Sequence, residues 1–140
     1  MSFSTAALLL LISLVLVLVW SVRASLAVRR NLAPFWSRSC TGRAWKRRFP
    51  AASAKEIRAF LQLFCKAFTF PRSRALHFLP EDRLADIYQA RNPPEYGLPD
   101  SLDIEDFAER LAEAYQLELQ SFWRDDLTLG DVFARTHTKA

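Results

Sequence analysis

The chain has 140 residues, of which 51% are apolar, a net charge of +4 and two cysteines. An apolar stretch takes up the first 22 residues and a basic stretch the next 28. About 90 residues remain to fold, enough for one small domain and too few for an enzyme with a deep cleft. The two cysteines, Cys40 and Cys65, exclude a disulfide-rich secreted framework and match no metal or redox spacing.

The net charge conceals a strong asymmetry along the chain. Residues 1–50 carry a charge of +8 without a single acid, residues 51–75 carry +4, and residues 76–140 carry −8. We expect the basic end to face an anionic partner and the acidic end to face a basic protein.

Residues 3–22 predict a transmembrane helix. The segment has no charge and contains twelve Leu, Ile or Val, and twenty helical residues span ~30 Å, the thickness of the hydrocarbon core. A cleaved signal peptide is the alternative, but it needs positive charge before a shorter apolar run. Here eight basic residues follow the segment and none precedes it. The positive-inside rule then predicts a single-pass anchor in the cell membrane, with the N-terminus outside and the folded domain in the cytoplasm.

Residues 23–50 form a basic juxtamembrane segment in which aromatic residues are interleaved with the charges. Contact with anionic lipid is the favoured interpretation because the segment is tethered at the membrane, where each basic side chain contributes at most ~1 kcal/mol. A plain linker that only sets the topology is the alternative, and we expect no nucleic acid. The residues expected to contact anionic lipid are Arg23, Arg29, Arg30, Lys46, Arg47 and Arg48.

Residues 51–140 predict a small all-α domain, because apolar residues recur at helical spacing and no alternating strand pattern competes. Ser53 with Glu56, and Thr128 with Asp131, have the spacing of capping boxes at helix starts. The four expected helices begin at Ser53, Pro80, Asp100 and Thr128. The residues expected in the core are Phe60, Leu61, Phe64, Leu84, Ile87, Phe107, Leu111, Tyr115 and Phe133.

One short motif points to a chemical site. Asp100-Ser101-Leu102-Asp103, at the expected start of the third helix, resembles the attachment motif of acyl and peptidyl carrier proteins. The resemblance covers residues 100–135 and includes the segment from Leu127 to Val132, which is similar to the opening of that family's last helix. Further apolar residues that match the family's long helix are Phe107, Leu111, Tyr115 and Leu119.

In that family the serine carries a 4′-phosphopantetheine arm donated from coenzyme A, and acyl groups are carried on the thiol of the arm. The resemblance implies this role for Ser101, with Asp100 at the helix start and Leu102 as an apolar contact for the transferase. The physical setting agrees, because a serine in the first turn of a helix is exposed and its phosphate lies near the positive end of the helix dipole.

The sequence therefore predicts a membrane-anchored acyl-carrier-like protein that is not itself an enzyme. The acids expected to bind a basic partner protein are Asp103, Glu105, Asp106 and Glu109. Two alternatives stay open: a membrane-tethered adaptor with the same acidic face and no prosthetic group, and a helical domain that resembles a carrier by coincidence. His77 and His137 are single and far apart, so we expect no metal site.

Overall fold

The computed structural model describes residues 3–96 and 102–138. Every regular element in these ranges is a helix, so the predicted all-α class is confirmed. In chain order the elements are α1 (Phe3–Trp36), α2 (Gly42–Arg48), α3 (Ala54–Ala67), η1 (Arg72–His77), α4 (Leu84–Arg91), η2 (Pro94–Tyr96), α5 (Leu102–Tyr115), η3 (Leu119–Phe122) and α6 (Leu129–Thr138).

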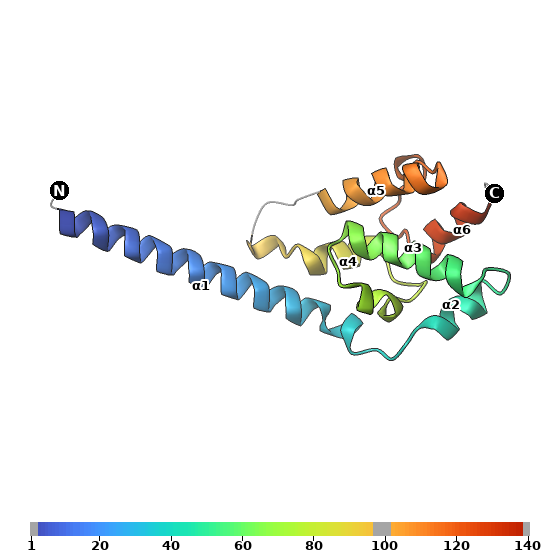
Figure 1. The fold of residues 1–140 in the computed structure, drawn as a ribbon, viewed down its shortest axis with the longest axis horizontal. Coiled ribbons are helices and arrows are strands. Elements are labelled where there is room, and N and C mark those ends of the chain that lie inside the picture. The colour runs from blue at the N-terminus through green and yellow to red at the C-terminus, as the bar shows by residue number, and fades with distance from the viewer. Residues whose placement is uncertain (1–2, 97–101, 139–140) are drawn as a thin grey trace.

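The long helix α1 has two parts with different surroundings. Its first part projects alone from the rest of the molecule, and its second part lies beside α4 (Figure 1). The large apolar side chains between Leu8 and Val22 are exposed, and the helix is long and apolar enough to cross a membrane. The helix does not end with this apolar part, because it continues unbroken to Trp36.

The predicted juxtamembrane segment is built into the fold, which differs from the expectation that folding begins at Ala51. Ala27 and Leu32 of α1 are buried, and Trp45 of α2 is fully buried. The indole Nε1 of Trp45 donates a hydrogen bond to the carbonyl of Phe78 over 2.8 Å. The apolar positions were hidden in the sequence because arginines separate them, and the helix turns those arginines outward while its other face packs.

Helix α3 lies at the centre of the fold. Its predicted capping box is present, because the Glu56 amide donates to the Ser53 hydroxyl over 3.1 Å and the Ser53 amide donates to the Glu56 carboxylate over 2.8 Å. Eight of the nine expected core residues are fully buried or nearly so. Tyr115 is the exception, since it is only partly buried and packs against the edge of the core. Burial and the nearby charge of Glu56 both raise the pKa of the Tyr115 hydroxyl.

The second helix begins at Leu84 and not at the predicted Pro80. The backbone between these residues bonds to another loop: the Leu84 amide donates to the Leu127 carbonyl over 3.0 Å, and the Pro80 carbonyl accepts from Gly130 over 2.8 Å. In a helix that starts at Pro80, the Pro80 carbonyl would accept a hydrogen bond from the Leu84 amide. Because both groups are bonded to the other loop, the helix begins at Leu84. Asp82 completes the turn, since its carboxylate accepts from the Leu79 amide over 2.7 Å.

The loops before α4 and α6 pair with each other. Arg83 and Thr128 form an antiparallel bridge, the only one within residues 3–96 and 102–138. The Leu84–Leu127 hydrogen bond has a counterpart from the Leu129 amide to the Asp82 carbonyl, also 3.0 Å. The residues that follow are alike, Leu-Ala-Asp-Ile at 84–87 and Leu-Gly-Asp-Val at 129–132. The fold therefore contains two similar helical units, α3-η1-α4 and α5-η3-α6, joined where their loops meet.

Gly130 is required at this junction. A Cβ atom on it would lie 2.8 Å from the Pro80 carbonyl oxygen, closer than real Cβ atoms approach. The capping box predicted for the last helix is present next to it, with 3.1 Å hydrogen bonds in both directions between Thr128 and Asp131. Asp131 also pairs with Arg48 and with Arg124, each over 3.3 Å.

Replacement of Trp45 by Ala tests whether residues 23–50 belong to the folded unit. We expect it to lower the free energy of unfolding by about 3–5 kcal/mol, since it opens a cavity and removes the hydrogen bond to Phe78. The readout is the urea dependence of Cys65 labelling in the full chain in micelles, with Cys40 replaced by Ser. Cys65 is buried, which raises the pKa of its thiol to about 12 and protects it in the folded state.

The matched control is Trp123→Ala, because Trp123 is 38% exposed. This variant should change the free energy of unfolding by about 1 kcal/mol or less. Equal and small effects of both tryptophan substitutions would contradict a core that includes α2.

Replacement of Asp131 by Asn tests the loop junction through its pH dependence. Partial burial raises the pKa of Asp131, but the hydrogen bonds from Thr128 and the charges of Arg48 and Arg124 outweigh this and lower it below 3.8. A carboxylate with a lowered folded-state pKa stabilises the fold above its unfolded value and loses that contribution as the pH falls through the folded value. Asp131→Asn should therefore lose about 1 kcal/mol at pH 7.

The difference from the wild type should shrink progressively as the pH falls below about 4, the unfolded-state pKa, and through the lower pKa of the folded state. Urea unfolding followed by circular dichroism at neutral and acid pH measures it. Asp125→Asn, on the same loop and exposed, is the control and should have little effect at either pH. A gap between wild type and Asp131→Asn that stays constant with pH would show that the charge of Asp131 is not what stabilises the junction.

Candidate functional site

The predicted chemical site falls at the edge of the described structure. Asp100 and Ser101 lie outside the described residues, and Leu102 is the first described residue after them. Leu102 begins α5, and 63% of its surface is exposed. The site is therefore described by the surroundings of the first turn of α5.

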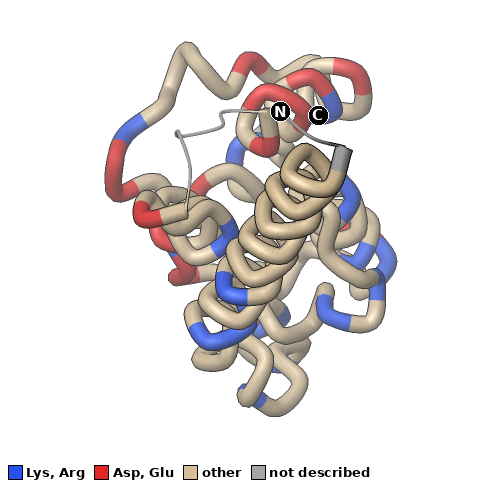
Figure 2. Tube along the Cα trace, turned by 90° about the vertical axis from the view of Figure 1, so that its left-hand side faces the viewer, with Lys and Arg blue, Asp and Glu red and all other residues tan. Residues whose placement is uncertain are grey.

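An acidic hollow lies on one side of this turn. It has a volume of about 450 Å³, and residues from the end of α3 and the first two turns of α5 line it. The lining residues are Ala67, Thr69, Leu102, Asp103, Glu105, Asp106 and Glu109. The structure thus brings together Leu102 and all four acids that the sequence suggested for a basic partner. Figure 2 shows that most acids gather toward the top and left of the molecule when it is viewed along α1, with a few bases among them, while the remaining bases lie mainly below and to the right.

The end of α3 shapes the floor of the acidic hollow. Thr69 has a φ of 58°, a conformation that β-branched residues rarely adopt. Two hydrogen bonds close the helix there: Thr69 donates to the Lys66 carbonyl over 3.3 Å, and Phe70 donates to the Cys65 carbonyl over 2.8 Å. This turn reverses the chain and leaves Thr69 facing the acids of α5.

An apolar hollow lies on the other side of the first turn of α5. Its volume is about 510 Å³, within the ~300–1,000 Å³ typical of small-molecule pockets. It lies between α4, α5 and the residues after η3, and its lining residues are Ala85, Tyr88, Gln89, Asn92, Pro94, Ile104 and Trp123. The sequence interpretation missed Trp123, although the aromatic pair Phe122-Trp123 between polar residues was a visible signal.

A hydrogen-bonded link holds the two sides of the apolar hollow together. The side-chain amide of Asn92, just after α4, donates to the Asp103 carboxylate over 3.1 Å and to the Tyr88 carbonyl over 3.2 Å. Asp103 therefore helps to position α5 against α4, in addition to lining the acidic hollow.

The basic residues predicted for lipid contact divide into two groups. Arg23, Arg29 and Arg30 are exposed along α1. Lys46, Arg47 and Arg48 belong to α2, which lies at the opposite end of the molecule from the free end of α1 (Figure 1). Two of this second group bond to protein: Lys46 donates to the Ala52 carbonyl, and Arg48 pairs with Asp131 over 3.3 Å.

The two histidines lie apart. His137 Nε2 is 3.6 Å from the Glu56 carboxylate, and the pKa of Glu56 is lowered mainly by the Ser53 backbone hydrogen bond and further by His137. His77 lies in η1, next to the ring of Trp36. In the described ranges no three His, Cys, Asp or Glu residues are grouped so that they could hold a metal ion.

Comparison with known proteins identifies no relative. No model of a protein family matches the chain, and no curated protein or solved structure matches it significantly. The geometry around α5 and α1 is therefore the basis for inferring function.

Proposed function

We propose that the chain is a membrane-anchored, acyl-carrier-like protein with its folded domain in the cytoplasm. In this proposal α1 holds the domain at the membrane, Ser101 carries the prosthetic group, and the first turns of α5 present an acidic face to a basic partner protein. The chain has no catalytic role of its own.

The anchor is supported by the surroundings of α1. Its large apolar side chains from Leu8 to Val22 are exposed, and a soluble protein rarely exposes so large an apolar surface. A cleaved signal peptide shares the apolar composition. It does not explain why the same helix continues for another 14 residues and ends in the core at Trp36. Continuity with the core favours an anchor that stays attached.

The orientation follows from charge. Eight basic residues lie between the apolar stretch and Pro50, and none lies before it. Basic residues that flank a span remain on the cytoplasmic side. We therefore propose that the N-terminus lies outside and that α2 to α6 lie in the cytoplasm.

One observation carries the carrier proposal: the first turn of α5 combines an exposed leucine, an acidic hollow and an apolar hollow. Ser101 directly precedes Leu102 in the sequence. The apolar hollow, which Ile104 of the same turn lines, is a surface where an acyl group carried by the chain could be shielded from water. Basic enzymes that act on the acyl group would be attracted by the four acids.

An adaptor without a prosthetic group is the second candidate. The four acids and Leu102 line one hollow, and a basic partner could bind there without a modified serine. In this function the apolar hollow would accept a side chain of the partner, with Trp123 and Tyr88 as its walls.

Phosphopantetheinylation of the full chain in micelles separates the two candidates. Incubation with coenzyme A and a transferase of broad specificity should add the mass of one phosphopantetheine group, measured by intact-protein mass spectrometry. Ser101→Ala should abolish the addition, whereas Ser121→Ala, a serine elsewhere on the acidic half, should not. An unmodified wild-type protein, both in this assay and when isolated from its native cell, would leave the adaptor as the function.

Reporter fusions test the orientation. An enzyme that is active only in the cytoplasm should be active when it is fused after Ala140, and one that is active only outside should be inactive there. Introducing three arginines before Phe3 should increase the fraction of chains that insert with Ala140 outside the cytoplasm, because it reduces the difference in positive charge across the span. A fusion at Ala140 that is active only outside the cytoplasm would contradict the proposed orientation.

A further inference from the structure

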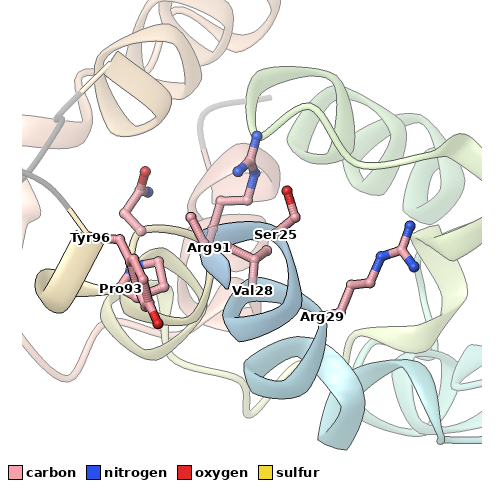
Figure 3. Close-up of a pocket in the computed structure, with 8 residues that line it drawn as sticks. Ser25, Val28, Arg29, Arg91, Pro93 and Tyr96 are labelled. Atoms are coloured by element: carbon pink, nitrogen blue, oxygen red, sulfur yellow. The ribbon is translucent and has the colours of Figure 1, made fainter. Parts of the chain in front are cut away.

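A third hollow opens between α1 and the end of α4, and neither proposed activity of α5 uses it. Its volume is about 470 Å³. Two turns of α1 contribute Ser25 and Arg29, and the last turn of α4 contributes Arg91. Arg29 and Arg91 are the only charged residues among its described lining. Figure 3 shows the guanidinium of Arg91 and the hydroxyl of Ser25 pointing in the same direction, whereas the side chain of Arg29, one helical turn further along α1, extends away from them.

The hollow lies just beyond the apolar part of α1. The ring of Trp20 packs edge-on against the ring of Tyr96, with 5.4 Å between centroids. Trp and Tyr favour the headgroup level of a membrane, so this pair indicates where that level lies on the molecule. Ser25 and Arg29 follow Trp20 by ~8 Å and ~14 Å along the helix axis. The headgroup layer extends ~5–8 Å beyond the hydrocarbon core, and a long arginine side chain can reach back into it.

The charges at the hollow are available to an anion from outside the described chain. Within residues 3–96 and 102–138, neither Arg29 nor Arg91 forms an ion pair. The nearby carboxylate of Asp103 accepts a hydrogen bond from Asn92 over 3.1 Å, so the Asn92 amide is already engaged. The hollow therefore has the Arg91 guanidinium and the Ser25 hydroxyl on one side and the flexible side chain of Arg29 at its rim, and these donors suit the oxygens of a phosphate.

We propose that this hollow binds the phosphate of an anionic phospholipid headgroup. The inference rests on the proposed anchoring by α1 and makes it specific, because it replaces a diffuse attraction of basic residues with one site of defined residues. Arg91 contacts the phosphate and Ser25 donates to it, the Arg29 side chain turns toward it from the rim of the hollow when the lipid binds, and Tyr96 packs at the level of the glycerol.

A simpler explanation exists for each arginine alone. Arg29 would only help to set the topology, and Arg91 would only stabilise the C-terminal end of α4, where a cation is favoured. Neither explanation requires the two residues to line one hollow. A defined site and diffuse attraction can be distinguished by experiment. A site binds one lipid through both arginines, whereas diffuse attraction depends equally on any basic residue at the same height on α1.

Native mass spectrometry of the full chain in micelles of an uncharged detergent tests the site, with phosphatidylglycerol and phosphatidylcholine as probes. The wild type should retain one phosphatidylglycerol and prefer it to phosphatidylcholine. Arg29→Gln and Arg91→Gln should each weaken its binding about tenfold. Arg30→Gln is the matched control, since it removes the same charge from the adjacent position of α1, outside the hollow, and should change the affinity less than about twofold.

Equal losses in Arg30→Gln and Arg29→Gln would overturn the site and leave only diffuse attraction. Wild-type affinity in Arg29→Gln and Arg91→Gln would also overturn it. Inorganic phosphate is the second probe: if it binds with the same arginine dependence while phosphatidylglycerol does not bind, the ligand is a soluble phosphate and the lipid proposal is wrong. Cys65 labelling shows that each variant is folded.

Anchoring itself is measured separately, by extraction of the chain from membranes at alkaline pH. A chain that alkali releases overturns the anchor, whereas an anchored chain without lipid preference overturns only this site.

Discussion

Leu32 and Trp36 lie on the same helix as the exposed apolar residues of α1, and they pack against the core. This packing fixes the direction of the apolar part relative to the domain. A flexible linker would let the domain rotate freely above a membrane, but a continuous helix holds each face at a set height. In the proposed anchoring, the end of α4 and η2 would lie close to the membrane, because Tyr96 contacts Trp20, and α2 would lie far from it.

The pairing of the two loops has a similar role inside the domain. The hydrogen bonds between residues 82–84 and 127–129 connect the unit that contacts α1 to the unit that contains α5. Arg38 extends this connection, since its guanidinium holds the buried carboxylate of Asp82 through two bonds of 2.6 and 2.9 Å. Asn92 supplies a second connection through Asp103. The surface around the first turn of α5 is therefore held at a set position relative to α1.

The sequence predicted well what depends on local pattern. The helical class, both capping boxes and eight of nine core residues follow from periodicity and from short-range hydrogen bonds, which neighbouring residues determine. Predictions that depend on distant contacts differed from the structure. Helix α4 begins at Leu84 and not at the predicted Pro80, because the Pro80 carbonyl and the Leu84 amide form hydrogen bonds with a loop more than 40 residues later.

The same limit explains what was missed at the candidate site. The acids of α5 were identified because they are close in sequence, and the structure gathers them. Arg91 and Trp123 were overlooked because each lines a hollow together with residues that are distant in the sequence. Arg91 lines one hollow with Arg29, and Trp123 lines the other with Ile104. Trp45 was assigned to a basic segment because its charged neighbours dominated the composition, whereas its own burial depends on Phe78.

The chain length between two described residues adds a constraint on how a carrier would work. Leu102 follows Tyr96 by six residues, and six residues span at most ~22 Å even when fully extended. Since Tyr96 packs on Trp20, the start of α5 lies within that distance of the level that Trp20 indicates. In the proposed anchoring, the start of α5 would therefore lie within reach of partners bound at the membrane surface. Enzymes that receive an acyl group from the chain are then expected to be basic and membrane-bound, because a partner at the same surface meets the acidic face without diffusing from the cytoplasm.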